Sequence, residues 1–224
     1  MTDTSPSETA TATPLSAIEI RVLGVLVEKS FVTPDVYPLS LNAIVSGCNQ
    51  LTGRDPVMSL SDEEVRAALA SLIERRLVAQ CDQAGARVAK YEHLLRLRYS
   101  IAAPEQAALA TLMLRGPQTS GEIRQRSERM HAFADLAAVE AALERLGNKY
   151  PPLVTTLPRL PGTKEARHAQ LLAGDAVLAE ASAAAAPAAA ARPGRDALEA
   201  EVQRLRTELD ALRAEFEAFR ARFD

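Results

Sequence analysis

Apolar positions along the first half of the chain predict three helices followed by a β-hairpin. The first helix opens at a capping box, Ser16–Glu19, and places Ile18, Val22 and Leu26 on one face. A second capping box, Ser61–Glu64, opens the third helix, and the residues beyond it favour two strands joined by a turn. The predicted elements are helices from residue 16, over 41–48 and over 61–76, and strands over 77–81 and 87–94.

The same order recurs in the second half, and a short pattern closes each copy. Residues 85–94 read G-x-basic-x-x-basic-aromatic-x-x-L, and residues 162–171 repeat this pattern with His168 in the place of Tyr91. An internal duplication explains the repeat better than chance. The second set of predicted elements comprises helices over 104–115, 119–130 and 135–147, and strands over 153–157 and 164–172.

Three helices closed by a hairpin form the winged-helix arrangement, a relative of the helix-turn-helix. The sequence therefore predicts a mainly α protein with small β-hairpins, in the α+β class, with two tandem winged-helix domains at 15–95 and 96–173. Aromatic residues make up only 4% of the chain, so the core must consist chiefly of aliphatic residues, which favours helices. Each domain is small enough to be marginally stable alone, so we expect the two to pack together.

The flanking segments differ from the domains in composition. Residues 1–14 are rich in Ser, Thr, Ala and Pro and are expected to be disordered, and residues 174–196 are dominated by Ala and Pro, as in a linker. Residues 197–224 show the 4,3 apolar spacing that is typical of a coiled coil. Its apolar positions are Leu198, Val202, Leu205, Leu209, Leu212, Phe216, Phe219 and Phe223. Glutamates at g and arginines at e favour a parallel homodimer, and the alternative is an amphipathic helix folded back on the domains.

Net charge and reactive residues give little support to several classes of function. A net charge of -3 gives the whole chain no polyelectrolyte character. The two cysteines, Cys48 and Cys81, and three dispersed histidines have no metal-ligand spacing, and no Gly-rich phosphate loop or nucleophile elbow is present. We therefore expect no metal, no cofactor and no enzymatic activity. No apolar run is long enough to cross a membrane and the start lacks a signal-peptide pattern, so a cytoplasmic location is expected.

The stretches Thr33–Asn42 and Cys48–Ser61 carry a long motif of mixed chemistry. With this motif the chain resembles the bacterial YceH-like family over residues 15–173. The resemblance implies two winged-helix domains and suggests nucleic-acid binding, and it brings no catalytic residue. Leu51 and Gly53 stand where lysine and asparagine are expected in that family, which removes one positive charge from the segment.

Charge is divided unevenly between the predicted domains. Residues 15–95 contain eight basic and ten acidic residues, whereas residues 96–173 contain eleven basic and seven acidic residues. Both third helices are acidic, which opposes their entry into a DNA groove. Contact with DNA phosphates is therefore predicted for basic residues of the second helix and of the wings, with solvated surface charge as the alternative. These residues are Arg124, Arg126, Arg129, Lys164, Arg167, Arg87 and Lys90.

The densest polar cluster lies around the segment between the second and third helices of the first domain. It is a candidate surface for a ligand or a protein partner, although such side chains also satisfy backbone groups of irregular loops. Its residues are Asn42, Asn49, Gln50, Thr52 and Arg54. The sequence thus favours a non-enzymatic, dimeric protein that associates with duplex DNA or has a regulatory role. The alternative is an adaptor whose winged helices dock protein partners.

Overall fold

The computed structural model describes residues 13–81, 88–159, 163 and 165–174, together with Gln203, Arg204, Thr207 and Arg213. The chain divides into two units, residues 1–183 and 184–224. In the second unit the four described residues are helical, and the Thr207 hydroxyl donates to the Gln203 carbonyl oxygen at 3.0 Å. All apolar positions of the predicted coiled coil lie outside the described residues, so its self-association stays a prediction.

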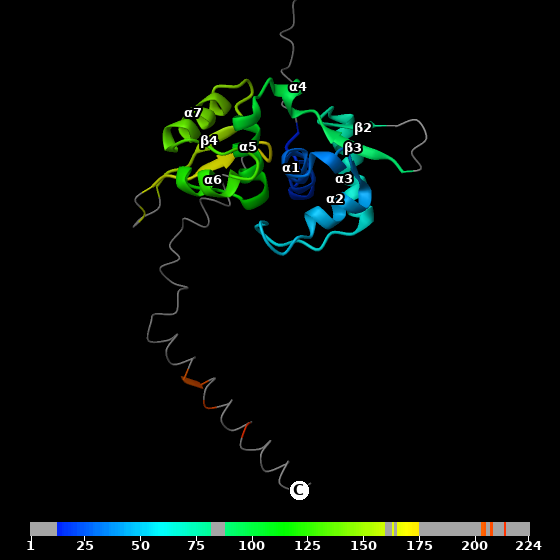
Figure 1. Ribbon diagram of the computed structural model, residues 1–224, viewed down its shortest axis with the longest axis horizontal. Coiled ribbons are helices and arrows are strands. Elements are labelled where there is room, and N and C mark those ends of the chain that lie inside the picture. The colour runs from blue at the N-terminus through cyan, green and yellow to red at the C-terminus, as the bar shows by residue number, and fades with distance from the viewer. Residues whose placement is uncertain are drawn as a thin grey trace, which may run out of the picture. The chain divides into compact units, whose positions relative to one another are not determined.

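The first part of unit 1–183 combines three α-helices with a three-stranded antiparallel sheet (Figure 1). Its elements are α1 (Ala17–Val32), the short 3-10 helix η1 (Pro34–Val36), β1 (Leu39–Ser40), α2 (Leu41–Cys48), α3 (Asp62–Glu74), β2 (Val78–Cys81) and β3 (Lys90–His93). The strand order is β1-β3-β2, with Tyr91 opposite both Leu39 and Gln80. The two-residue strand β1 was not predicted, because its extended backbone leads directly into the N-cap of α2 at Ser40.

The second part repeats this order after a connecting helix, α4 (Leu95–Tyr99), which was also not predicted. Its elements are α5 (Ala103–Arg115), α6 (Ser120–Ser127), α7 (Leu136–Gly147), β4 (Val154–Thr156) and β5 (His168–Gln170). Gln118 forms a bridge with His168, so β5 is paired on both edges, as β3 is in the first part. The second helix of this part ends at Ser127, three residues before the predicted end, because the chain turns there.

Side-chain caps fix where the helices begin. Ser16 Oγ accepts from the Glu19 N–H at 3.2 Å, and the Glu19 carboxylate accepts from the Ser16 N–H at 2.6 Å. The same reciprocal pair joins Ser61 to Glu64 at α3 and Thr119 to Glu122 at α6. Each box satisfies backbone donors that the first helical turn leaves free, so the predicted starts of these helices are confirmed.

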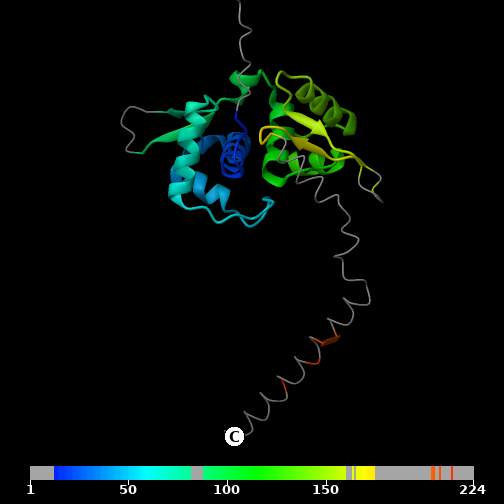
Figure 2. The same ribbon diagram turned by 180° about the vertical axis from the view of Figure 1, so that it is seen from behind.

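The core lies where α1 and α5 pack against each other between the two parts (Figures 1 and 2). Nine consecutive residues of α1, Glu19–Val27, and ten of α5, Glu105–Leu114, are buried. Gly24 permits the close approach, since a Cβ there would lie 3.0 Å from Leu114 Cδ2. The sequence predicts one buried face on α1, but the structure buries a second face as well, because α5 covers it. Seven α-helices and small antiparallel sheets in the described residues confirm the α+β class.

Candidate functional site

The α2–α3 loop (residues 49–61) is closed by the side chain of Asn49. Its Nδ2 donates to the Leu60 carbonyl oxygen at 2.8 Å, and its Oδ1 accepts from the Leu60 N–H at 2.7 Å. The side-chain amide of Asn49 thus supplies hydrogen-bond partners for the N–H and carbonyl groups of Leu60, which have no backbone partner in this irregular loop. Within the predicted ligand or partner surface, Asn49 therefore has a structural role.

Arg54 anchors the middle of the same loop in the interior. Its residue exposure is 6%, and its guanidinium donates to both carboxylate oxygens of Glu28 and to the Gly47 carbonyl oxygen. It also donates to Gln50 Oε1 at 2.9 Å, so Gln50 is engaged as well. Burial opposes the ionisation of Glu28, but the hydrogen bonds and charge of Arg54 outweigh it and hold the pKa of Glu28 below its usual value.

Two other residues of the predicted surface, Asn42 and Thr52, are exposed to solvent. Neither side chain forms a hydrogen bond with another residue in the described part of the chain. The structure therefore separates the five predicted residues into three that hold the loop and two that are exposed, Asn42 on α2 and Thr52 on the loop.

Arg21 of α1 is a functional candidate that sequence reasoning missed. It is 1% exposed, and it donates to the carbonyl oxygens of Cys48 at 3.1 Å and Pro56 at 2.6 Å. Burial, followed by the nearby charge of Arg54, lowers the pKa of Arg21. The available signal was a single cation inside the otherwise apolar run from Ile20 to Val27.

Three arginines predicted to contact phosphate form contacts within the protein. Arg124 donates to the carbonyl oxygens of Phe133 and Ala134, at 3.3 and 2.8 Å, and so ties down the segment between α6 and α7. Arg126 donates to Gln118 and lies 3.4 Å from a Glu122 carboxylate oxygen. Arg167 donates to the Pro117 carbonyl oxygen at 2.7 Å and also lies 3.4 Å from Glu122.

The remaining predicted basic residues are dispersed. Arg129 is exposed and has no ion pair with a described residue. Lys90 begins β3, opposite Ser40 and Cys81, far along the chain from the others. Arg87 and Lys164 lie outside the described residues. Of the predicted wing residues, Arg167 is joined to α6 through Glu122, which it shares with Arg126, whereas no described contact joins Lys90 to α6.

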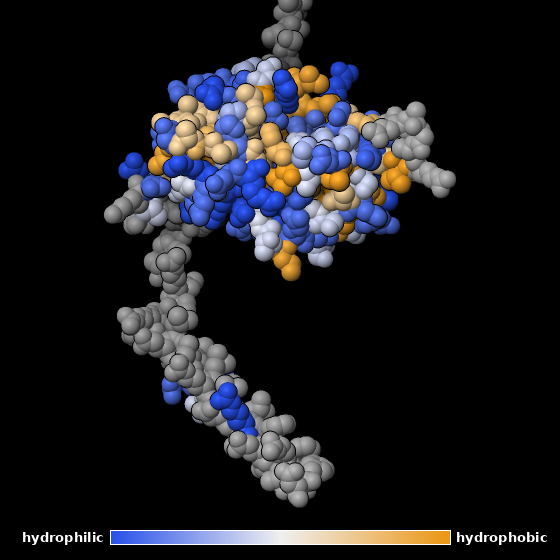
Figure 3. All heavy atoms as spheres, in the orientation of Figure 1, coloured by the Kyte–Doolittle hydropathy of each residue, from blue (hydrophilic) through white to orange (hydrophobic). Residues whose placement is uncertain are grey.

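A further cation, Arg115, lies near enough to Arg54 and Arg126 for their charges to act on it. It ends α5, and a Cβ added at Gly53 would lie 3.2 Å from its Nη2 atom. Burial and the charges of Arg126 and Arg54 together lower the pKa of Arg115. No carboxylate of the described residues lies within 4.0 Å of its guanidinium. We refer to Arg54, Arg115 and Arg126 as the arginine cluster; Figure 3 shows strongly hydrophilic residues gathered over α6 on this face.

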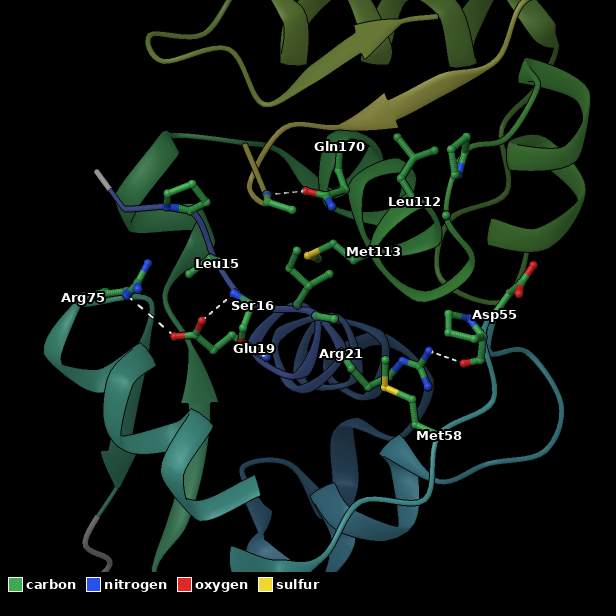
Figure 4. Close-up of a pocket in the computed structure, with 17 residues that line it drawn as sticks. Leu15, Ser16, Glu19, Arg21, Asp55, Met58, Arg75, Leu112, Met113 and Gln170 are labelled. Carbon is green, nitrogen blue, oxygen red and sulfur yellow. Dashed lines mark hydrogen bonds and ion pairs between the residues drawn. The ribbon is translucent and has the colours of Figure 1, made fainter. Parts of the chain in front are cut away.

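A cavity of about 660 Å³ lies beside α1 and α5 (Figure 4). Its walls come from α1 with the segment before it, from α5, from the α2–α3 loop and from the end of β5. Glu19 and Arg75 contribute an ion pair at 3.7 Å. Burial alone raises the pKa of Glu19, but hydrogen bonds from Ser71 and Ser16 outweigh it and hold the pKa below its usual value.

Within residues 13–81, 88–159 and 165–174 no three His, Cys, Asp or Glu side chains are grouped as metal ligands. No helix in the same ranges is sufficiently long and apolar to span a bilayer.

Comparison with known proteins places the chain in a bacterial family. A model of a protein family of unknown function, DUF480, matches residues 15–163. A UPF0502 protein of Azoarcus sp. strain BH72 is 62% identical over 205 residues, which cover 90% of this chain and 91% of the relative. A UPF0502 protein of Aromatoleum aromaticum is 60% identical over 208 residues, covering 91% of each chain. A UPF0502 protein of Geobacter sulfurreducens is 52% identical over 165 residues, covering 74% of this chain and 75% of the relative.

These matches span most of the chain and include the motif in residues 33–61, in agreement with the resemblance found from the sequence. The chain therefore belongs to the DUF480 family of bacterial proteins.

Proposed function

We propose that the chain is a non-enzymatic, nucleic-acid-associated protein of two winged-helix domains, and that the exposed part of its arginine cluster contacts phosphates. The repeated order of elements supports the winged-helix assignment. In each part a segment after the first helix pairs with the returning strand of the hairpin, β1 with β3 and Gln118 with His168. This pairing closes a small sheet beside three helices, as the winged-helix arrangement requires.

The observation that carries the proposal is the crowding of cations around Arg115. Its guanidinium is half-buried beside Arg54 and Arg126, and the described residues offer it no ion pair. Like charges at short range in a partly desolvated site repel one another. The carboxylates of Glu28 and Glu122 pair with Arg54 and Arg126, so a phosphate would supply Arg115 with the close negative charge that it lacks.

The negative charge of the third helices limits which parts of a nucleic acid the protein can recognise. Asp62, Glu63 and Glu64 occupy the first turn of α3 and are all exposed. Carboxylates at this position repel the phosphates that flank a DNA groove. We therefore propose that the protein contacts the phosphates of the nucleic-acid backbone and that α3 does not recognise bases.

Salt-dependent binding to a random-sequence duplex, followed by fluorescence anisotropy, tests this proposal. Arg115→Gln and Arg126→Gln should each lower the slope of log affinity against log salt by about one, the loss of one phosphate contact. Arg66→Gln is the matched control, because Arg66 is an exposed arginine on α3. Slopes that stay at the wild-type value in both cluster variants, with their melting temperatures unchanged, would refute the proposal.

A protein-interaction adaptor is the second candidate, and the acidic face of α3 favours it. Four acidic residues of this helix, Asp62, Glu63, Glu64 and Glu74, are exposed against one exposed arginine, Arg66. Such a surface complements a basic protein partner. Failure of the wild-type protein to bind duplex at low salt would favour this candidate. Capture of a partner from nuclease-treated lysate that is lost in Glu63→Lys and Glu74→Lys would then support it.

A further inference from the structure

The cavity beside α1 contains two hydrogen-bond donors without acceptors. The Nε atom of Arg21 is buried and has no hydrogen-bond partner. Gln170 is 6% exposed, and its Oε1 accepts from the Ala173 N–H at 3.2 Å. Its Nε2 atom donates to no group within the described ranges. Figure 4 shows Arg21 and Gln170 on opposite sides of the cavity.

Both unpaired groups are donors, so a complementary ligand must bring acceptors. Buried polar groups in native proteins almost always have a partner, so the orphaned Nε atom of Arg21 indicates a missing acceptor, and Gln170 Nε2 is a further donor in the same wall. Arg21 adds a full positive charge, and no carboxylate of the described residues lies within 4.0 Å of its guanidinium. Three other charged side chains line the wall: Glu19 and Arg75 form an ion pair, and Asp55 is exposed to solvent.

The wall between these two donors is apolar. Ile20 of α1 faces Leu112 and Met113 of α5, and Leu15 adds to the same surface. Met58 lies beside Arg21 in Figure 4, and its unbranched side chain can move aside to admit a ligand group. A volume of about 660 Å³ suits a small organic molecule.

We propose that this cavity binds an elongated amphipathic carboxylate. The carboxylate group lies against Arg21, the hydrocarbon part lies along Leu112 and Met113, and Gln170 donates to an oxygen at the far end. None of the three residues of the arginine cluster lines this cavity, so the proposal does not depend on nucleic-acid binding. Because both parts of unit 1–183 line the cavity, the ligand also stabilises their packing.

Calorimetric titration of the full chain with three probes of equal length tests the proposal. Octanedioate carries an acceptor at both ends, octanoate only at one, and octanediol lacks charge. We expect octanedioate to bind more tightly than octanoate by about tenfold and octanediol to bind weakest, since a hydrogen bond to a charged group contributes about 1.5–3 kcal/mol. Absence of measurable octanedioate binding, or equal affinities for all three probes, would overturn the proposal.

Two variants test which residue binds which end of the ligand. Gln170→Glu keeps an acceptor for the Ala173 N–H but replaces the free donor, so it should weaken octanedioate at least tenfold and leave octanoate unchanged. Arg21→Gln should weaken both carboxylates at least tenfold, and Gln125→Leu, an exposed position on α6, is the control. If Arg21→Gln fails to fold, Gln170→Glu still decides. Octanedioate affinity that is unchanged in folded Gln170→Glu contradicts the assignment.

Discussion

The guanidinium of Arg54 donates to both carboxylate oxygens of Glu28, from Nη1 to Oε1 at 3.1 Å and from Nη2 to Oε2 at 2.6 Å. This bidentate pair joins the α2–α3 loop to α1. The side chain of Arg54 is 1% exposed and that of Glu28 is 20% exposed, so the pair is largely removed from water. Loss of Glu28 therefore leaves the buried charge of Arg54 without a carboxylate, and loss of Arg54 leaves Glu28 with only Lys29, at 3.4 Å.

We predict that Arg54→Met lowers the free energy of unfolding by about 3–5 kcal/mol, because Glu28 then keeps only Lys29 as a cation and the loop loses its buried hydrogen bonds to Glu28 and Gly47. Glu28→Gln keeps one acceptor and should cost about 1–3 kcal/mol. Urea unfolding followed by circular dichroism measures both values. Arg66→Met, on the exposed face of α3, serves as control and should stay within about 0.5 kcal/mol of wild type. An equally small effect of Arg54→Met would show that the pair does not stabilise the fold.

His93 should make the stability of the protein fall in acid. Its Nδ1 is buried without a partner, and its Nε2 lies 3.2 Å from Ser30 Oγ. Burial lowers the pKa of His93 from 6.5 to about 4. Between these pH values the unfolded chain binds a proton that the folded chain does not, so the unfolding free energy rises with pH in this window and levels off above it.

The loss on going from pH 6.5 to about 4 should reach about 3 kcal/mol for this single group. Urea unfolding at intervals across the window measures it. His93→Gln should remove this part of the slope, whereas His131→Gln retains His93 and should keep it. If the unfolding free energy of His93→Gln depends on pH as steeply as that of the wild type, groups other than His93 cause the acid sensitivity.

Gly47 of α2 should tolerate no side chain while Val25 of α1 is present. A Cβ at position 47 would lie 2.6 Å from Val25 Cγ1, which is inside van der Waals contact. We predict that Gly47→Ala destabilises by about 1–3 kcal/mol despite the better helix propensity of alanine. Adding Val25→Ala should recover part of the stability that Gly47→Ala loses. A double-mutant cycle measures this recovery.

Gly121 of α6 is the matched control, because a Cβ there would meet nothing nearer than Thr119 Oγ1 at 3.9 Å. Gly121→Ala should therefore stabilise by about 0.5–1 kcal/mol. Equal effects of alanine at positions 47 and 121 would contradict the packing explanation.

Local signals predicted the elements well, because caps and hydrophobic spacing act within a few residues. The boxes at Ser16, Ser61 and Thr119 are confirmed as helix starts. The candidate site was harder to predict, since it depends on contacts across the chain. Nothing local distinguishes Arg54, which binds Glu28 twenty-six positions away, from an exposed loop arginine. Arg115 likewise gains its role only because the fold places it beside Gly53.

Self-association through residues 197–224 stays a prediction, and charge exchange tests it sharply. In a parallel pair the g residues Glu201, Glu208 and Glu215 face the arginines at e of the partner helix, Arg206, Arg213 and Arg220. Changing the three glutamates to arginine should leave a monomer, because like charges then meet across the seam. Changing the three arginines to glutamate in the same chain should restore the dimer. Light scattering gives the molar mass of each variant, and a monomeric mass for the wild-type chain would instead favour a helix packed against its own domains.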